Sequence, residues 1–338
     1  MVSIKKIAEL AGVSMSTASF ILNGKGDEAR IAKATQKKVL ELARELGYSP
    51  NIAARRLRGG KGNMVPVIAI FWTIDTRTSL ISRFLRGINF SYHSHESEFE
   101  LVIQPYVNSE LKNVKSLFTG NNFNGAIIAN ASDEDLLHLE NNEVNVPIVL
   151  YQRKSKKFSS VLVDSVQTGS DVARLFHSRK HKNVGLIQPS ISSQAVQLRK
   201  EGFLNELKKY EMYLSDQHII EGDFSEEGGY HCALELINQQ ILPSAIFSLS
   251  DHMAIGALAA FHKAGINIPK DIEMIGYDDN ENSRFSIPSL TTVHLPVEDM
   301  ANECLNILLE LIHQKAKQPI AREWTTSIVI RDSCGDFF

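Results

Sequence analysis

The chain has 338 residues, of which 43% are hydrophobic and 22% charged, so it is long enough for two or three domains with cores of their own. No apolar run approaches the roughly 20 residues that span a bilayer, and no signal-peptide pattern opens the chain, so we expect a cytoplasmic protein. The net charge is −3, yet residues 1–62 hold 12 basic and 5 acidic residues, which leaves the remainder net acidic. This pattern is expected when only the N-terminal segment contacts phosphate.

The first 22 residues predict two helices joined by a tight turn. The apolar face of the first helix repeats at i, i+3, i+4 and i+7 and consists of Ile4, Ile7, Ala8 and Ala11. Gly12 permits a sharp turn, and Ser14 is a suitable cap for a second helix from Met15 to about Leu22. The residues left on the outer face, where a recognition helix meets the major groove, are Met15, Ser16, Thr17, Ser19 and Phe20. DNA binding is therefore the first functional hypothesis.

A third helix, a short basic helix and a linker follow. The apolar spacing predicts the third helix from about Ala32 to Leu46, and Gly47 is typical of the residue after a helix end. The short helix spans residues 52–58 and is rich in Ala and Arg. The glycines of residues 59–63 form a flexible linker, so we expect the N-terminal unit to move independently of the body.

From residue 65 onward, strand and helix patterns alternate in two successive blocks. The predicted strands cover 65–71, 100–103, 125–129, 147–151, 160–164, 183–188, 218–221, 245–249 and 272–277. The predicted helices cover 80–96, 166–179, 194–210, 225–240, 251–265 and 296–315. Continuous apolar strands between helices predict parallel sheets covered on both faces. We therefore expect an α/β fold: an all-α helix-turn-helix headpiece followed by a body of two similar lobes.

Polar residues follow several predicted strands directly. Parallel sheets bind ligands at the carboxyl ends of their strands, so two facing lobes would bring these residues into one cleft. The residues are Trp72, Thr73, Asn130, Gln152, Arg153, Ser250, Asp251, Asp278 and Asp279.

Seven segments stand out along the chain: IKKIAELAGVS at 4–14, LGYSPN at 46–51, ARRLR at 54–58, EGDF at 221–224, SDHMAIGA at 250–257, IGYDD at 275–279 and RDSCG at 331–335. In this order they resemble the lactose-repressor family of bacterial transcription regulators. The resemblance implies a DNA-binding repressor without enzyme activity, with a body like the periplasmic sugar-binding proteins. The expected divisions are a headpiece at 1–48, a hinge helix and linker at 49–62, an N-lobe at 63–163 plus 294–324, and a C-lobe at 164–293 plus 325–338.

For DNA, the resemblance implies a homodimer whose two headpieces read successive major grooves of double-stranded operator DNA. Leu57 matches the family's wedge residue, which enters the minor groove and kinks the duplex. Arg55 lies beside it, and Phe20 stands where an Arg is often found, so apolar contact replaces guanine reading there. The full set of expected DNA-binding residues is Met15, Ser16, Thr17, Ser19, Phe20, Asn23, Asn51, Ala54, Arg55, Leu57 and Arg58.

For the body, the resemblance implies a small, carbohydrate-like effector bound between the lobes. Arg199 matches the family's effector-binding Arg, and Asp278 matches its hydroxyl-binding carboxylate. Ser250 stands where Asn is usual, and Gln152 where Asp is frequent. The full set of expected effector-binding residues is Trp72, Thr73, Asn130, Gln152, Arg199, Phe224, Ser250 and Asp278. Asp279 is expected to cap a helix.

Other functional classes fit the sequence less well or remain open. A solute-binding transport protein would have a similar body but no basic headpiece, and a phosphorylated partner protein is an alternative to the small effector. The sequence has no Gly-x-Ser-x-Gly hydrolase motif and no Gly-x-Gly-x-x-Gly or P-loop after the first strand. The pairs His93/His95 and His177/His181 lack a third ligand nearby, and Cys232, Cys304 and Cys334 are scattered, so we expect free thiols and neither metal nor cofactor.

Overall fold

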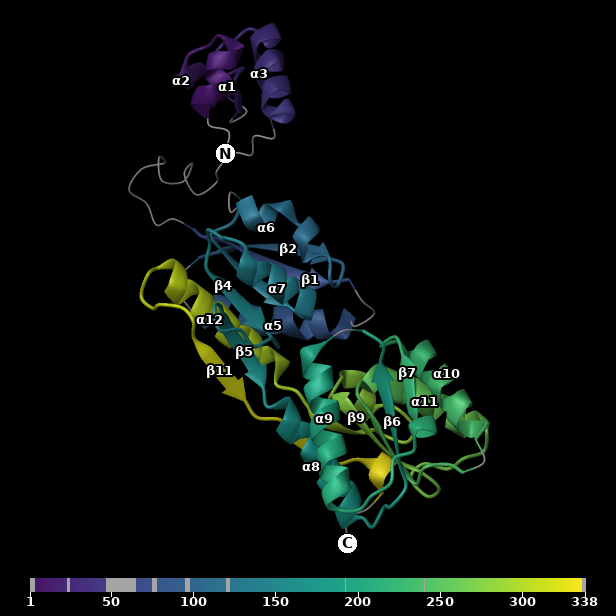
Figure 1. Cartoon of the computed structure of the whole chain (residues 1–338). Helices are drawn as coiled ribbons and strands as arrows, with labels where there is room; N and C mark the ends of the chain where they lie inside the picture. The colour runs from purple at the N-terminus through teal and green to yellow at the C-terminus, as the bar shows by residue number, and fades with distance from the viewer. Residues whose placement is uncertain are drawn as a thin grey trace.

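A computed structural model describes residues 4–22, 25–46, 65–74, 78–94, 98–119, 122–191, 193–239 and 241–335. They form an N-terminal helical unit and a body of two lobes (Figure 1). The predicted hinge helix at 52–58 lies outside the described residues.

The N-terminal unit is built from three short helices, α1 (Ile4–Ala11), α2 (Met15–Leu22) and α3 (Lys33–Glu45). Each helix contributes one apolar face to a small shared core, because its apolar residues recur with helical spacing. The fully or nearly fully buried members of this core are Ile7, Ala8, Ala11, Ala18, Ile21, Val39 and Ala43. The predicted extent of the third helix is confirmed to within one residue at each end.

The first lobe, called the N-lobe, has a six-stranded parallel sheet in the order β11-β5-β4-β3-β1-β2. Its strands are β1 (Val67–Thr73), β2 (Glu100–Tyr106), β3 (Gly125–Ala129), β4 (Ile148–Tyr151), β5 (Ser159–Val163) and β11 (Ala321–Trp324). Its helices are α5 (Thr78–Ser94), η1 (Leu111–Asn113), α6 (Lys115–Thr119), α7 (Asp133–Asn141) and α12 (Val297–Ile312). Every residue of β1 is buried, as expected for a central strand covered on both faces.

The second lobe, called the C-lobe, has a sheet in the order β12-β10-β9-β8-β6-β7. Its strands are β6 (Val184–Pro189), β7 (Ile219–Gly222), β8 (Ala245–Ser248), β9 (Glu273–Asp278), β10 (Thr291–His294) and β12 (Ser327–Val329). Its helices are α8 (Ser165–Ser178), α9 (Gln194–Lys209), η2 (Asp216–His218), α10 (Glu226–Ile237), α11 (Asp251–Lys263), η3 (Glu281–Arg284) and η4 (Asp332–Cys334). One departure from an all-parallel sheet is the edge strand β12, which pairs antiparallel with β10.

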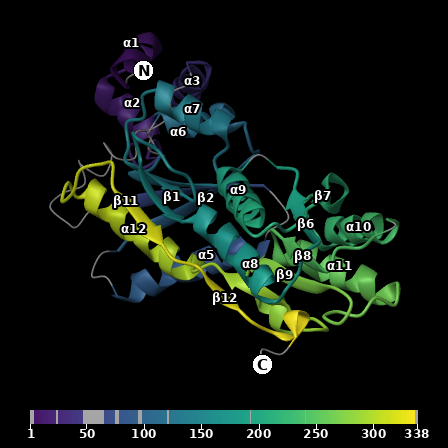
Figure 2. The same cartoon turned by 60° about the horizontal axis from the view of Figure 1, so that its bottom comes forward.

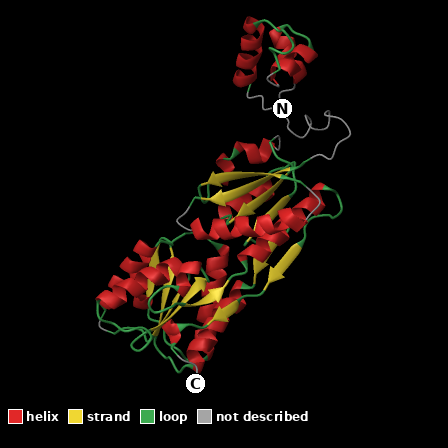
Figure 3. Cartoon of the chain, turned by 180° about the vertical axis from the view of Figure 1, so that it is seen from behind, coloured by secondary structure: helices red, strands yellow, loops and turns green. Residues whose placement is uncertain are grey.

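The chain crosses between the lobes three times, after β5, after β10 and after β11. Figure 2 shows the last crossing, where the chain leaves β11 in one lobe and enters β12 in the other. These crossings lie next to the expected divisions at 163/164, 293/294 and 324/325. Figure 3 shows that helices flank both sheets, which is the layered arrangement predicted from the alternating pattern. No helix in the described part of the chain is long and apolar enough to cross a membrane.

Two glycines allow α8 and α9 to approach closely. A Cβ atom on Gly169 would lie 1.9 Å from the carbonyl oxygen of Arg199, and one on Gly202 would lie 1.9 Å from that of Val166. Neither contact is possible with a side chain present, so glycine is required at both positions. The spacing of these helices matters for the site, because α9 carries Arg199.

A buried carboxylate organises the loop after β9. Asp251, fully buried at the start of α11, accepts hydrogen bonds from the backbone N–H of Asn280 at 2.8 Å and from the hydroxyls of Ser283 at 2.6 Å and Thr292 at 2.5 Å. Burial, helped by repulsion from Asp278, raises the pKa of Asp251 to about 7, although the three donors oppose the shift. The carboxyl group therefore ties β10 and η3 to α11.

We predict that Gly202→Ala lowers the free energy of unfolding by about 3 kcal/mol, because the new methyl group overlaps backbone atoms of α8. Chemical denaturation measures the loss. Glu201→Ala, an exposed neighbour on the same helix, is the matched control and should change stability by less than about 0.5 kcal/mol. Equal stabilities of the two variants would contradict the close-approach argument.

We also predict a pH dependence of stability from Asp251. Its folded pKa is raised, so its contribution is fully present below the unfolded value near 4 and is lost as the pH rises through about 7. Relative to Asp251→Asn, the wild-type chain should therefore lose on the order of 4 kcal/mol between pH 4 and pH 8. Denaturation curves across this range measure the difference. Asp271→Asn, an exposed site with a lowered pKa, should show no change above pH 5.

Candidate functional site

The outer face of α2 is the first candidate site. Gly12 takes the left-handed conformation with φ +72°, and the hydroxyl of Ser14 accepts a hydrogen bond from the backbone N–H of Thr17 at 3.0 Å. This cap fixes the start of α2 as the sequence indicated. Met15 and Phe20 are 55% and 47% exposed, although both are apolar. A small unit that leaves large apolar side chains in solvent on one helix presents them for contact with a partner.

The other expected DNA-binding residues are distributed as follows. Ser16 is exposed on α2, whereas Thr17 and Ser19 are half-buried. Six more lie outside the described residues: Asn23, Asn51, Ala54, Arg55, Leu57 and Arg58. Their expected roles remain predictions.

The second candidate site is a cavity between the lobes, at the carboxyl ends of strands from both sheets. Its volume is about 30 Å³. The N-lobe contributes Leu80, Asn130, Tyr151 and Gln152, and Leu295 comes from the crossing between the lobes. The C-lobe contributes Ser193, Ala195, Val196, Arg199, Phe224, Leu249, Tyr277 and Asp278. Five of the eight expected effector-binding residues are therefore brought together: Asn130, Gln152, Arg199, Phe224 and Asp278.

Strained backbone marks the strand ends around this cavity. Asn130 follows β3 with φ 58°, Gln152 follows β4 with φ 59°, and Phe224 lies just beyond β7 with φ 70°. Asp278 ends β9 with φ 112°, and Asp279 follows with φ 54°. Residues other than glycine rarely adopt these conformations, and where they occur they concentrate at functional sites. Four of these five residues, Asn130, Gln152, Phe224 and Asp278, line the cavity.

Arg199 and Tyr277 form the polar centre of the C-lobe wall. Arg199 is 4% exposed, its guanidinium carbon lies 3.1 Å from the centroid of the Tyr277 ring, and its Nη1 donates to the carbonyl oxygen of Leu249 at 3.4 Å. Burial raises the pKa of Tyr277, and the positive charge of Arg199 opposes the shift. The cation is thus held against an aromatic face, where it is weakly hydrated.

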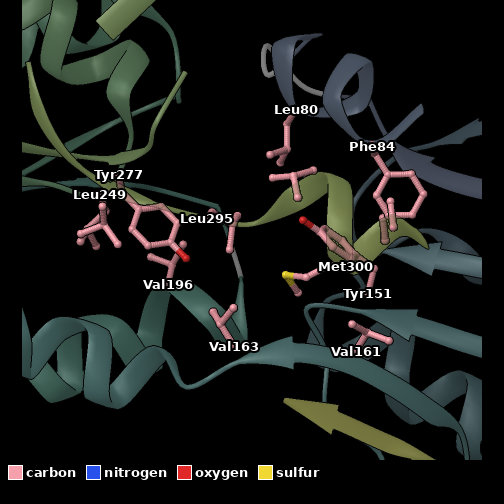
Figure 4. Packing of buried hydrophobic residues seen from close by; sticks show 14 of the residues in the cluster. Leu80, Phe84, Tyr151, Val161, Val163, Val196, Leu249, Tyr277, Leu295 and Met300 are labelled. Carbon is pink, nitrogen blue, oxygen red and sulfur yellow. The ribbon is translucent and has the colours of Figure 1, made fainter. Parts of the chain in front are cut away.

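The sequence analysis did not identify Tyr151 and Tyr277. Figure 4 shows the two rings on opposite lobes with both hydroxyl groups directed into the space between them. Tyr151 is fully buried, and its hydroxyl has no hydrogen-bond partner among the described residues. Burial raises the pKa of Tyr151 well above its usual value, so the hydroxyl stays protonated. Tyr151 directly precedes Gln152, and Tyr277 directly precedes Asp278, both of which were expected in the site. The sequence signal that could have identified the two Tyr residues is an aromatic side chain with a polar hydroxyl at the end of a predicted strand.

Three expected residues do not line the cavity. Trp72 is 5% exposed and packs against Phe84 and Tyr151, with ring centroids 5.2 and 6.1 Å apart, so it supports the site from behind. Thr73 is buried and accepts a hydrogen bond from Asn130 at 3.4 Å. Ser250 is fully buried at the start of α11. Trp72 and Thr73 are the last two residues of β1 itself, covered by core packing and by Asn130, and Ser250 is buried at the cap of α11, so none of the three side chains reaches the cavity.

Asp278 and Asp279 have different surroundings. Asp278 lines the cavity. Asp279 does not cap a helix as expected: its carboxylate accepts from Arg331 at 2.5 Å and from His294 at 2.9 Å. Burial opposes the charge on Asp279, but these two partners outweigh it and hold the pKa well below its usual range. Asp279 therefore connects the segment after β12, which carries Arg331, to the ends of β9 and β10 within the C-lobe.

A larger hollow of about 710 Å³ lies elsewhere, at the amino-terminal edge of the C-lobe sheet. Its lining includes Asn183, Tyr213, His218, Glu235 and Ile241. Parallel sheets bind ligands at the opposite edge. The smaller cavity, where charged and strained residues converge at the carboxyl ends of the strands, is therefore the candidate ligand site. Among the described residues, no group of three or more His, Cys, Asp or Glu side chains is placed to hold a metal ion.

Comparison with known proteins places both parts of the chain in one family. The model of bacterial regulatory proteins of the lacI family matches residues 3–51, and the periplasmic binding protein-like domain matches residues 173–334. The probable HTH-type transcriptional repressor ExuR of Bacillus subtilis (strain 168) is 30% identical, with 98% of each chain covered.

Solved structures agree with this assignment. A LacI family transcription regulator from Clostridium acetobutylicum is 33% identical, covers 79% of this chain and 99% of its own, and has a TM-score of 0.75. The lac repressor dimer bound to operator and the anti-inducer ONPF has the same fold, with a TM-score of 0.72, 23% identity and 99% of each chain covered. The chain therefore belongs to the lacI family of bacterial regulatory proteins and is a DNA-binding transcriptional repressor rather than an enzyme.

Proposed function

We propose that this repressor acts as a homodimer on the operator of a catabolic operon and is controlled by a carbohydrate-like effector bound between its lobes. The observation that carries the effector proposal is the convergence of Arg199, Tyr277 and Asp278 in one buried cavity. A guanidinium supplies fixed donors, a carboxylate accepts from paired hydroxyls, and aromatic faces pack against the C–H face of a sugar ring.

The size of the cavity links binding to lobe movement. About 30 Å³ is far below the roughly 300–1,000 Å³ of typical ligand pockets, so a sugar requires the lobes to separate. A hinge motion of this kind changes the angle between the two lobes. The N-lobe is the lobe that directly follows the expected hinge helix and linker in the chain. In this proposal, the spacing of two headpieces on DNA depends on the angle between the lobes.

One observation favours a second candidate, control by a phosphorylated partner protein. The same small cavity leaves little room for a ligand in the described arrangement. A partner that binds the outer surface of a lobe needs no such space. The two candidates share the DNA-binding role. They differ only in which molecule, a small effector or a partner protein, changes the angle between the lobes.

For the effector, we predict that calorimetric titration with a panel of mono- and disaccharides gives heat with at least one sugar. Arg199→Ala should weaken that binding about 10- to 100-fold, because a hydrogen bond from a charged group is lost. Gln197→Ala is the matched control, since Gln197 is exposed on the same helix and does not line the cavity. If no sugar gives binding heat, control by the partner protein is favoured. If Arg199→Ala and Gln197→Ala weaken sugar binding equally, Arg199 does not bind the effector.

For DNA, we predict that Phe20→Ala weakens binding to the operator, recovered as the genomic fragment that the purified protein retains. Loss of one apolar base contact should cost about 1–3 kcal/mol, with little change on unrelated DNA. Leu40→Ala is matched in exposure, 48% against 47%, but lies on α3, and should leave both affinities unchanged. Affinity should fall with salt at a log–log slope of about −0.9 per neutralised phosphate. If Phe20→Ala lowered the affinity for the operator and for unrelated DNA equally, Phe20 would not contact bases in a sequence-specific way.

A further inference from the structure

One face of α5 reaches across to the opposite lobe. Ser79 and Arg83 are four residues apart, so both side chains project from the same side of the helix. Both make hydrogen bonds to the C-lobe loop at residues 278–280. We propose that this pair, called the α5 clasp, holds the lobes in their closed arrangement and that Arg83 positions Asp278 in the effector site. Only the role of Asp278 rests on the proposed function.

Arg83 connects three parts of the chain. It is 6% exposed, and its Nη1 donates to the carbonyl oxygen of Asp278 at 2.6 Å. Its Nη2 donates to the carbonyl oxygen of Leu295 at 2.8 Å, in the crossing that leads from β10 to α12. Nη2 and Nε also donate to the carboxylate of Glu298 at 2.9 to 3.2 Å. One guanidinium thus bonds to the C-lobe, to a crossing segment and to the N-lobe.

Asp278 needs such support because its backbone is strained. Its φ of 112° is a conformation that side-chain-bearing residues rarely adopt, and it directs the next residues away from β9. The short bond from Arg83 stabilises the carbonyl group of this same residue. Arg83 therefore acts on the effector site through the backbone of Asp278, and it is a positioning residue.

Ser79 adds a second connection one turn earlier. Its hydroxyl lies 3.1 Å from Oδ1 of Asn280 and 2.9 Å from Nε2 of His252, both in the C-lobe. The other ring nitrogen of His252 lies 2.5 Å from the carboxylate of Glu226 at the start of α10. Asn280 is in turn held by the buried Asp251. The acceptor for Ser79 is therefore part of the rigid loop after β9.

On its other side, α5 is fixed to the N-lobe. A Cβ atom on Gly87 would lie 2.1 Å from the carbonyl oxygen of Glu298, so α5 packs directly on the first turn of α12. Phe84, next to Arg83, is fully buried in the core with Trp72 and Tyr151. Because α5 cannot move independently of this lobe, lobe opening must break the bonds to Asp278 and Asn280. The clasp thus sets part of the energy difference between the closed and open arrangements.

The test measures lobe separation without any effector. Glu134→Cys on α7 and Glu227→Cys on α10 place nitroxide labels at exposed positions on either side of the cleft. The native cysteines Cys232, Cys304 and Cys334 are all buried, so labelling is selective among the described residues. Labelled chain is mixed with excess unlabelled chain, and pulsed electron paramagnetic resonance gives the distance distribution within one protomer.

We expect Arg83→Met to raise the ratio of long to short distances about tenfold, because the charge-assisted bond to the carbonyl group of Asp278, which holds only in the closed arrangement, is lost. Arg83→Lys should restore part of the short population, since a single ammonium cannot reach all the acceptors. Arg86→Met is the matched control on the same helix: the Arg86 side chain is 58% exposed, and among the described residues its ion pair is with Glu298 of the same lobe, at 3.9 Å. It should leave the distribution unchanged.

Hydrogen exchange gives a second readout. Arg83→Met should speed exchange of a peptide covering residues 273–285, whereas Arg86→Met should not. Ser79→Ala removes a less buried side chain, and it keeps the proposal testable if Arg83→Met does not fold. Unchanged distances in folded Arg83→Met, or in Ser79→Ala if the former does not fold, overturn the clasp. Failure of every sugar in calorimetry overturns the proposed effector instead, because the distance measurement uses no ligand.

Discussion

Two parallel sheets that face each other with the carboxyl ends of their strands impose the arrangement on which the rest of this repressor depends. The ends of β3, β4 and β9 thereby bring Asn130, Gln152 and Asp278 to the same narrow space. The backbone at Asn130, Gln152, Phe224 and Asp278 is strained, and the sheets beneath are rigid enough to hold it. The strain is tolerated because six-stranded sheets covered on both faces fix each strand end in position.

The charged side chains around this space are paired with opposite charges or held by hydrogen-bond donors or an aromatic ring. Arg83 is paired with Glu298 and Asp279 with Arg331, and Arg199 faces Tyr277. Asp251 is fully buried and is held by donors instead of a cation. Burying a charge is costly unless it is paired or hydrogen-bonded, so these arrangements fix the geometry of loops that would otherwise vary. The polar network and the cavity are therefore one structural unit.

The N-terminal DNA-binding unit is held together by apolar packing. Three amphipathic helices share a core made mainly of Ile, Val and Ala, and this small core leaves Met15 and Phe20 in solvent. Its connection to the body passes through a glycine-rich segment. Control of such a unit has to act through the lobe that directly follows the segment. The contacts of α5 with the loop at residues 278–280 join that lobe to its neighbour, so any change in the angle between the lobes has to break them.

The sequence by itself determined the helix-turn-helix, the two alternating blocks and the cavity residues Asn130, Gln152 and Asp278, because hydrophobic periodicity and polar residues after strands are local signals. Arg199 and Phe224 were expected only from the family resemblance. Tertiary structure alone decided that Trp72 supports the core, that Asp279 pairs with Arg331, and that Tyr151 and Tyr277 reach the cavity from opposite lobes. It also decided the role of Arg83, whose partners lie about 200 residues away. Pairing of residues so distant depends on how the lobes pack, which no local pattern in the chain encodes.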